Sequence, residues 1–494
     1  SLMDFPSRQF TANRPPCGRT RREFFWQFGG GFAAVPLIDL LSRDGFYGQQ
    51  VLANQTTSQS TFATRSPSTH FRPRAKRVVF FFMQGGPSQV DTFDYKAALS
   101  KYQGKSYSGG LQIGSNGRKV GLLTPSAFSF HQRGESGLQV SSLYPHLAKF
   151  ADDLCVVRSM YCDTPTHSPG ILQMNTGSIV VGRPSLGSWL NYGLGSENES
   201  LPGFVVMVDP RGGPRGGAGA WSAGFMPAVF QGTLFRSRGS TLLNLKTPAG
   251  ISKRSQRRSL DLLERLNQKH LDQRPGYSEL SARIQSYELA YKMQTTATEV
   301  VDLNRETAAT LDLYGLHRPE TADYGRKCLL ARRLLERGVR FVQLYSGGGA
   351  ESWDAHDDCI SNHRKHAAET DQPIAALIAD LQQRGLWEDT LLVWGGEFGR
   401  TPTSEGVGKP GRDHNHYGFS MWLAGGGVKG GQAVGATDEV GFRATEDRCH
   451  VSDLHATILH LMGLDHEKLT FLHEGLEKRL SGVQPRRVLR QVLA

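Results

Sequence analysis

Short apolar runs alternate with amphipathic segments along most of the chain. The runs have the length of buried strands and cover residues 77–83, 153–160, 202–208, 339–345, 390–394 and 419–423. Between them, leucines recur at helical intervals from about residue 255 to 337, and residues 367–385 form another helical pattern. This alternation predicts an α/β fold with a mostly parallel sheet that helices cover on both faces.

Residue types that bind divalent metals lie next to three of these runs. Asp354 and His356 follow 339–345, Glu397 follows 390–394, and His414 and His416 come just before 419–423. Carboxylates and imidazoles are ligands of hard and borderline metals, and open α/β sheets form their sites at the carboxyl ends of strands. The sequence therefore predicts a metal centre at this edge of the sheet.

The spacing within the two pairs, Asp354 with His356 and His414 with His416, supports this prediction. Residues two apart in an extended chain point to the same side, so the pairs can surround a cation together with Glu397. The alternative is a hydrogen-bonded, charge-paired network of loops without metal. His363 and His366 lie on the following helix, where we expect them to face solvent or to support the ligands from behind.

A further acidic candidate, Asp91, follows the first strand and a glycine turn. It is predicted either to bind the metal or to cap a helix and organise the turn. Ser88, in the same segment, also has two interpretations. It could be an exposed nucleophile, but a helix cap is the interpretation we prefer.

Two residues are candidates for the chemistry itself. His167 could attack phosphorus or bind metal, and the alternative is a neutral loop histidine held by hydrogen bonds. Arg400 lies just beyond Glu397 and could pair with an anionic oxygen of a substrate, or it could hold Glu397 in a salt bridge. We name His167 and Arg400 as the predicted catalytic residues.

Length and charge bound the possible classes of protein. The chain has 494 residues, a formal net charge of +11 and a pI of about 9.4. The length predicts one large domain with a long helical insertion and a separate leader. The charge is compatible with nucleic acid or anionic surfaces, but we favour a basic soluble protein with arginine-rich termini and do not expect nucleic acid. No segment reaches the ~18 apolar residues of a membrane span.

The six cysteines are scattered and form no CxxC motif, which argues against a structural zinc cluster. Cys155 and Cys162 could pair after export, and the alternative is that both remain free buried thiols.

The first residues resemble a twin-arginine export signal. Arg21 and Arg22 precede two aromatic residues and a weakly apolar stretch at 28–37. We assign 1–48 to this leader, 49–75 to a polar linker and 76–494 to the main domain, whose helical segment covers about 255–337. The export machinery is then a partner, and the expected location is the periplasm. A basic helix start is the alternative, and cleavage of the leader stays open.

Five further motifs of the main domain stand out: Gly85–Asp94, Trp353–His356, Glu397–Pro402, Gly411–His414 and Leu423–Gly431. Together they resemble the DUF1501 family, a bacterial group within the alkaline phosphatase/sulfatase-like superfamily. The resemblance implies an alkaline phosphatase-like three-layer sandwich. It also implies hydrolysis or transfer at phosphate or sulfate esters with one or two divalent metals.

Within this resemblance, His167 stands where sulfatases have the cysteine that becomes formylglycine, so formylglycine chemistry is not expected. Glu397 stands in the place of a metal carboxylate, and Phe398 replaces a second ligand beside it. Gln84 lies near where the superfamily has a metal aspartate. Either Asp91 substitutes for that ligand, or the ligand is absent.

These observations lead to three hypotheses. The first is an exported metal-dependent hydrolase of anionic phosphate or sulfate esters, with zinc, manganese or calcium as cofactor. Its predicted metal ligands are Asp91, Asp354, His356, Glu397, His414 and His416. The second is an inactive member of the superfamily that acts as a binding or assembly protein. The third and weakest is a binder of anionic polymers.

Overall fold

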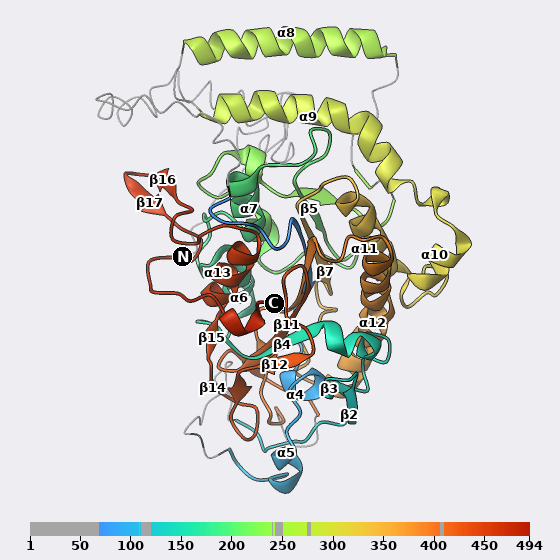
Figure 1. Cartoon of the computed structure of the whole chain (residues 1–494), viewed down its shortest axis with the longest axis vertical. Helices are drawn as coiled ribbons and strands as arrows, with labels where there is room; N and C mark the ends of the chain where they lie inside the picture. Colours follow the sequence, from blue (N-terminus) through green and yellow to red (C-terminus); the bar gives the residue numbers. More distant parts are fainter. Residues whose placement is uncertain are drawn as a thin grey trace, which may run out of the picture. The chain divides into compact units, whose positions relative to one another are not determined.

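The computed structural model describes residues 69–494 apart from 108, 110–119, 240, 243–249, 274–277 and 406–409. In this part of the chain nine strands form one sheet (Figure 1). Their order is β12 (Gln432–Val434), β4 (Leu154–Tyr161), β11 (Phe419–Gly425), β8 (Thr390–Gly395), β1 (Arg77–Met83), β7 (Phe341–Ser346), β5 (Phe204–Met207) and β6 (Thr233–Phe235), with β15 (Cys449–His450) beside β4.

The sheet is mostly parallel, as the sequence predicts. Strand β11 is antiparallel to both of its neighbours, β4 and β8, and the other pairings are parallel. Each of the six predicted runs overlaps one of these strands, and their ends differ by at most two residues. The central strand β1 is almost wholly apolar because layers of side chains cover both of its faces.

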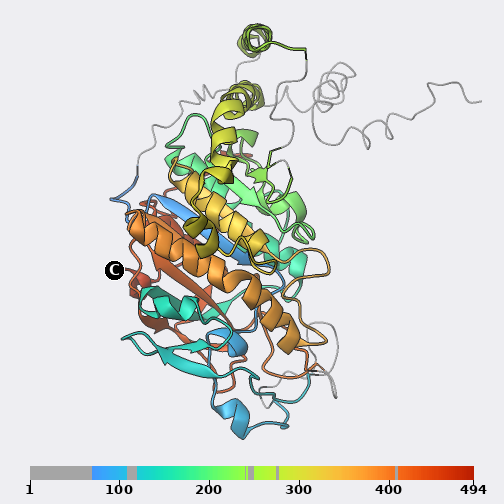
Figure 2. The same ribbon diagram turned by 90° about the vertical axis from the view of Figure 1, so that its right-hand side faces the viewer.

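Helices cover both faces of this sheet. They are α6 (His167–Thr176), α7 (Leu186–Leu194), α11 (Ala322–Leu335), α12 (Cys359–Gln383) and α13 (Val451–Leu461). Val79, Phe81 and Met83 of β1 pack in one core cluster with residues of α11 and α12, which cross the sheet in Figure 2. Val78, Phe80 and Phe82 belong to the opposite cluster, with α6, α7 and α13. The predicted three-layer α/β architecture is therefore confirmed.

The predicted helical segment contains α8 (Lys253–Asp272), α9 (Ser278–Val301), α10 (Ala308–Leu313) and α11. Figure 1 shows α8 and α9 side by side beyond the end of the sheet. Helix α11 instead packs on β7 and leads into it, so the end of this segment belongs to the layer that covers the sheet.

Shorter elements complete the described part. The helical ones are α4 (Gln89–Thr92), α5 (Ala98–Lys101) and the 3-10 turns η2 (Leu147–Asp153), η3 (Gly217–Trp221), η4 (Ala228–Phe230), η5 (Leu303–Arg305) and η6 (Arg490–Val492). The small strand pairs are β2 (Phe130–Arg133) with β3 (Leu138–Ser141), β9 (Gly399–Arg400) with β10 (His414–Asn415), β13 (Ala436–Thr437) with β14 (Ala444–Glu446), and β16 (Phe471–His473) with β17 (Leu476–Lys478).

The predicted leader and most of the predicted linker lie outside the described residues. Among the described helices, none is both long and apolar enough to cross a membrane. Cys155 and Cys162 are free and buried, so the structure favours free thiols over the disulfide.

A buried carboxylate joins α12 to η2. Asp371 of α12 accepts hydrogen bonds of 2.8 Å from the backbone N–H groups of both His146 and Leu147. Burial raises the pKa of Asp371 to about 6, although these two N–H groups oppose the shift.

This raised pKa predicts a pH-dependent stability difference between the wild type and Asp371→Asn. The folded state binds the proton more tightly than the unfolded state, so the contribution of Asp371 is complete at low pH and is lost as pH rises toward its folded pKa of about 6. The free energy of unfolding of the wild type relative to the variant should fall by about 3 kcal/mol across this window. Urea unfolding of both proteins at a series of pH values measures this difference. The prediction would be contradicted if the two plots of unfolding free energy against pH ran parallel.

Candidate metal centre

Five segments bring polar side chains to one edge of the sheet. The loops after β1, β7 and β8 start at the carboxyl ends of parallel strands. Because β11 is antiparallel to β8, the segment before β11 starts from the same edge. Strand β4 runs antiparallel to β11, so the loop that leads from β4 into α6 also begins here. The predicted location of the site at the carboxyl ends of the strands therefore agrees with the topology.

Three histidines and one carboxylate converge at this edge. Ligand atoms of His167, Asp354, His356 and His414 all lie within 4.8 Å of one another. Oδ1 of Asp354 is 2.9 Å from Nε2 of His356 and 3.3 Å from Nε2 of His414, and Oδ2 is 3.0 Å from Nε2 of His167. The two Nε2 atoms of His356 and His414 are themselves 3.0 Å apart. The inner nitrogen of each ring thus points at the same small volume.

The outer nitrogen of each ring is held by an acceptor behind it. Nδ1 of His167 lies 2.6 Å from Glu397 Oε1, Nδ1 of His356 contacts Glu405, and Nδ1 of His414 lies 2.7 Å from the carbonyl oxygen of Pro165. An acceptor at Nδ1 favours the tautomer whose proton is on Nδ1, which leaves the Nε2 lone pair free to bind a cation. Nε2 of His167 is buried and makes no hydrogen bond, although it lies next to the Asp354 carboxylate.

Two glycines allow the loops to approach this closely. Gly85 has φ of +107°, and a Cβ there would lie 2.3 Å from the backbone nitrogen of Asp354. A Cβ on Gly86 would lie 2.7 Å from the carbonyl oxygen of Phe398. The N–H of Gly85 also donates to Oε1 of Glu397 over 2.9 Å. The turn after β1 therefore fits only because these positions have no side chain.

Arg400 is fully buried beside the cluster. Its Nη2 donates to Oδ1 of Asp354 over 2.7 Å and also contacts the carbonyl of Gly85. Its Nε and Nη1 donate to the carbonyls of Gly86 and Arg412 at 3.1 and 3.2 Å. Arg400 thus connects three loops, and most of its guanidinium N–H groups are already hydrogen-bonded to protein atoms.

Arg215 is a candidate residue that the sequence did not predict. It lies in the glycine-rich loop after β5, and its Nη2 is 3.0 Å from Oδ2 of Asp354. The side chain is 39% exposed, so unlike Arg400 it borders both the cluster and solvent. The hydroxyl of Ser168, at the start of α6, donates to the carbonyl of Arg215 over 3.1 Å and anchors the loop there. The richness of this loop in Arg and Gly was the only signal in the sequence.

The charges of the cluster are coupled. Burial opposes ionisation of Asp354, but the three histidines and Arg400 hold the pKa of its carboxyl well below the usual range. Burial and Arg400 lower the pKa of His414 to about 4, although Asp354 opposes this shift. Burial also disfavours the charged forms of His167 and His356, but the neighbouring carboxylates outweigh it and raise the pKa of both imidazoles.

Asp91 lies apart from this cluster. Its buried carboxylate pairs with Nε of Arg412 at 2.8 Å and accepts from Oγ of Ser88 over 2.5 Å. Burial opposes its ionisation, but Arg412 outweighs it and lowers the pKa of Asp91. Ser88 is itself buried and occupies the N-cap position of α4, without a side-chain capping bond. The structure therefore places Asp91 in an ion pair that supports the segment before β11.

The two remaining predicted ligands, Glu397 and His416, do not face the volume that the three histidines share. Glu397 is completely buried and lies behind His167 instead of facing the shared volume. His416 is outside the cluster; its ring packs on Tyr417 at 3.8 Å between centroids, and burial lowers its pKa to about 4. A second candidate group, formed by His356 with Glu405 and Asp413, extends the first one.

His363 and His366 are both buried, so of their two expected placements the one facing solvent is wrong and the one behind the ligands remains. Nε2 of His363 accepts the backbone N–H of Ser88 over 2.8 Å, and burial lowers the pKa of this imidazole to about 3. Nδ1 of His366 is 2.9 Å from Glu369. Both histidines pack on Trp353, which precedes Asp354, and so they support the loop that carries this carboxylate.

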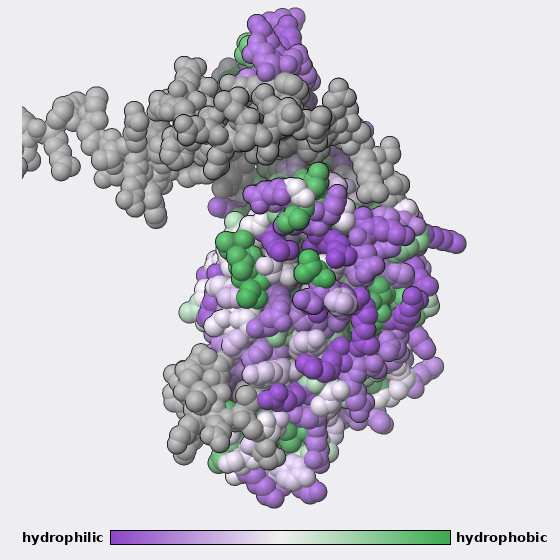
Figure 3. Space-filling view, turned by 90° about the vertical axis from the view of Figure 1, so that its left-hand side faces the viewer, coloured by the Kyte–Doolittle hydropathy of each residue, from purple (hydrophilic) through white to green (hydrophobic). Residues whose placement is uncertain are grey.

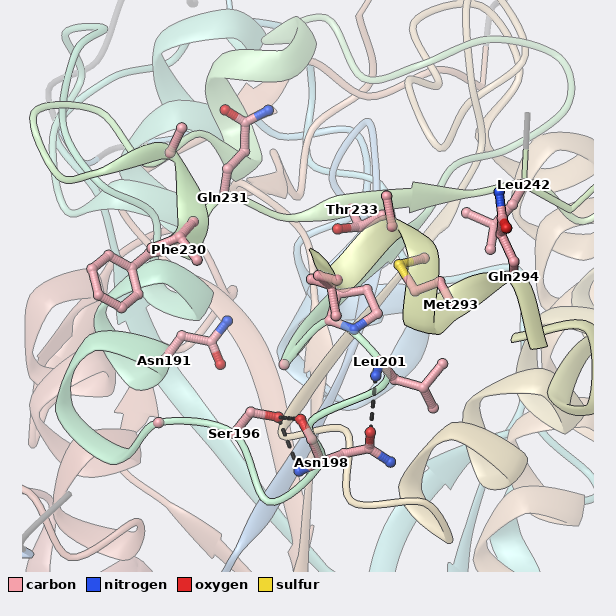
Figure 4. A pocket seen from close by; sticks show the side chains of 17 residues that line it. Asn191, Ser196, Asn198, Leu201, Phe230, Gln231, Thr233, Leu242, Met293 and Gln294 are labelled. Atoms are coloured by element: carbon pink, nitrogen blue, oxygen red, sulfur yellow. Dashed lines mark hydrogen bonds between the residues drawn. The ribbon is translucent and has the colours of Figure 1, made fainter. Parts of the chain in front are cut away.

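A separate cavity lies away from the histidine cluster. It has a volume of about 470 Å³ and is bordered by the amino ends of β5 and β6, by the loop after α7 and by α9 (Figure 4). Asn191, Phe230 and Met293 are among its walls, and the described residues that line it are uncharged. It lies at the strand ends opposite to the histidine cluster, and none of these described residues is a cation that could bind an anionic ester.

Comparisons with known proteins give one strong match. The family model described as a protein of unknown function (DUF1501) matches residues 75–493. No curated protein gives a significant match to this chain.

Several solved structures share weak similarity with the chain. The PsFucS1 sulfatase from Pseudoalteromonas sp. is 15% identical with a TM-score of 0.36, over 80% of this chain and 69% of that one. A protein in the alkaline phosphatase superfamily from Vibrio parahaemolyticus is 11% identical with a TM-score of 0.35, over 89% and 76%. The phosphonate monoester hydrolase SpPMH from Silicibacter pomeroyi is 14% identical with a TM-score of 0.34, over 84% and 76%.

The family match covers all the strands and helices described above and every residue of the histidine cluster. The chain therefore belongs to the DUF1501 family, as its motifs predicted.

Proposed function

We propose that this protein is a metal-dependent hydrolase of phosphate or sulfate esters, with its cation bound by Asp354, His167, His356 and His414. One observation carries the proposal. The inner nitrogens of three histidines converge on one carboxylate, while an acceptor occupies the outer nitrogen of each ring. Acceptors behind metal-binding histidines fix the ring orientation and raise the basicity of the ligand.

The donor set favours a particular class of cation. Three imidazole nitrogens with one carboxylate oxygen suit zinc or a similar transition metal better than calcium, which prefers a shell of oxygens. When bound, such a cation would polarise an ester oxygen and lower the pKa of a water molecule. Glu397 and Glu405 would hold the rings of His167 and His356 in place, and Arg400 would position Asp354.

Arg215 is the residue that we propose binds the anionic part of the ester. It is the half-exposed cation next to Asp354, and its guanidinium can direct two parallel N–H groups at a phosphate or sulfate. This assignment replaces Arg400, whose donors are spent on backbone carbonyls and on Asp354.

His167 is then a ligand and not the attacking group, because its only inward nitrogen faces the shared volume. The attacking group would be water. Formylglycine has no part in this proposal because the matching position is a histidine.

The second candidate function is a binding or assembly protein without catalysis. It is favoured by the number of cationic and imidazole groups that already surround Asp354: Arg400, Arg215 and three histidines. The same residues can form a complete charge-paired network without a metal. Metal content separates the two functions.

The first prediction concerns bound metal. The purified wild type should contain about one equivalent of zinc or a related transition metal per chain, and Asp354→Ala should contain almost none, because the carboxylate is the common neighbour of all three Nε2 atoms. Elemental analysis of both proteins measures this content.

The matched control is His317→Ala, which removes a 61% exposed histidine that is not one of the four candidate ligands and should retain the metal. Circular dichroism establishes that each variant is folded. A wild type that stays metal-free after dialysis against zinc would overturn the hydrolase proposal and support the binding protein.

The second prediction concerns Arg215. In the zinc-loaded protein, Arg215→Ala should weaken the binding of inorganic phosphate or sulfate about ten- to a hundredfold, because one charge-assisted hydrogen-bonding group is lost. Titration calorimetry measures the affinity. Arg215→Lys should recover part of it, and the metal content should not change in either variant. Equal affinity in the wild type and in Arg215→Ala would contradict the anion-binding role.

We also propose that the protein is exported to the periplasm by the twin-arginine route, on the sequence of residues 20–37 alone. Arg21→Lys with Arg22→Lys should leave the protein in the cytoplasmic fraction of a bacterial host. Arg14→Lys with Arg19→Lys makes the same chemical change outside the pair and should leave export intact. Immunoblots of cell fractions measure the distribution, and equal export of both variants would argue against the signal.

A further inference from the structure

Helix α8 lies outside the layers of the α/β domain. Its main packing partner is α9, and both Figure 1 and Figure 2 show it at the end of the molecule, beyond α9 and away from the sheet. The two helices are joined by charged contacts: Arg257 is 2.6 Å from Asp261 on its own helix and 2.6 Å from Glu288 on α9. Asn267, on the same side of α8, is buried.

The outward side of α8 combines cations with leucines. Arg254, Arg258, Leu262, Arg265 and Lys269 follow one another at intervals of three or four residues, so they form one stripe along the helix. All five are exposed, and Leu266 lies beside this stripe. The visible part of α8 in Figure 3, at the top, is almost wholly hydrophilic.

The exposure of the leucines is unusual for a helix in a folded domain. Leu262 is 52% exposed and Leu266 is 55% exposed. None of the four stripe cations makes an ion pair with a carboxylate within the part of the chain that the structure describes. Among the described residues, the stripe therefore combines unpaired positive charge with exposed apolar surface.

We propose that this stripe, Arg254 to Lys269, binds the surface of an anionic lipid membrane. Charge complementarity excludes a second copy of the stripe as partner, because the same cations would then face one another. Leucines between cations suit a bilayer, whose headgroups bind the cations while its acyl boundary accepts the apolar side chains. Nucleic acid or an acidic protein would use the cations alone. The proposal does not depend on the hydrolase function.

Each side chain contributes only modestly to the affinity for the membrane, so several residues of the stripe must bind together. A cation near an anionic leaflet strengthens binding about fivefold, and the effect decays within about a Debye length. Binding should therefore be reversible and should weaken as salt is added.

Sedimentation of the full chain with vesicles tests the proposal. The wild type should sediment with vesicles of phosphatidylcholine mixed with phosphatidylglycerol, and much less with phosphatidylcholine alone. Arg258→Gln with Arg265→Gln should reduce the partition coefficient about thirtyfold. The matched control is Lys101→Gln with Lys105→Gln, which removes the same charge from exposed residues at α5, at the other end of the molecule (Figure 1).

Leu262→Ser with Leu266→Ser separates a membrane from other polyanions. This variant keeps every charge and should lose about tenfold or more of its vesicle binding, because the apolar contact with the lipid is lost. Since both leucines face away from α9, thermal melting should not change in either α8 variant.

Three results would overturn the proposal: no sedimentation of the wild type with anionic vesicles, equal losses in the α5 control and the α8 charge variant, or full binding by the leucine variant. Binding to RNA or polyglutamate that the leucine variant retains, without vesicle binding, would identify a different class of partner.

Discussion

The arrangement of the sheet edge that carries the histidine cluster depends on balancing the negative charge of one buried carboxylate. Asp354 is 10% exposed, and a buried negative charge is stable only when donors or cations surround it. These groups come from α6, from the segment before β11, from β9 and from the loop after β5, besides the loop of Asp354 itself. Each of these segments must therefore be in position before the charge can be buried.

The sheet supplies that positioning through its strand directions and its turns. Parallel strands bring the ends of β1, β7 and β8 together, and the single antiparallel strand β11 adds the segment that carries His414. Gly85 then lets the first turn approach the backbone of Asp354 more closely than a side chain would allow. Arg400 stabilises this arrangement of loops by donating hydrogen bonds to backbone carbonyls of two of them. Burial of apolar strands and burial of one charge thus require the same geometry.

The sequence predicts well which strand ends form this site, because both the apolar runs and the ligand residues beside them are local features of the sequence. Apolar runs show where the strands lie, and ligand residues just beyond them show where the strands end. It predicts less well which residues share a volume. Residues two apart point the same way only in an extended chain, and β10 ends at Asn415, so His416 leaves the cluster. Asp91 is occupied by Arg412, and Arg215 reaches Asp354 from a distant loop that no spacing rule connects to it.

The separation of the candidate ligands along the chain has a consequence for the timing of metal uptake. His167, Asp354 and His414 lie on segments that meet only after β4, β7 and β11 have joined one sheet. An unfolded chain offers no such set, so a cation bound here would be acquired by the finished domain. Its affinity would then depend on how firmly the sheet is assembled, because no single segment carries more than two of the four candidate ligands.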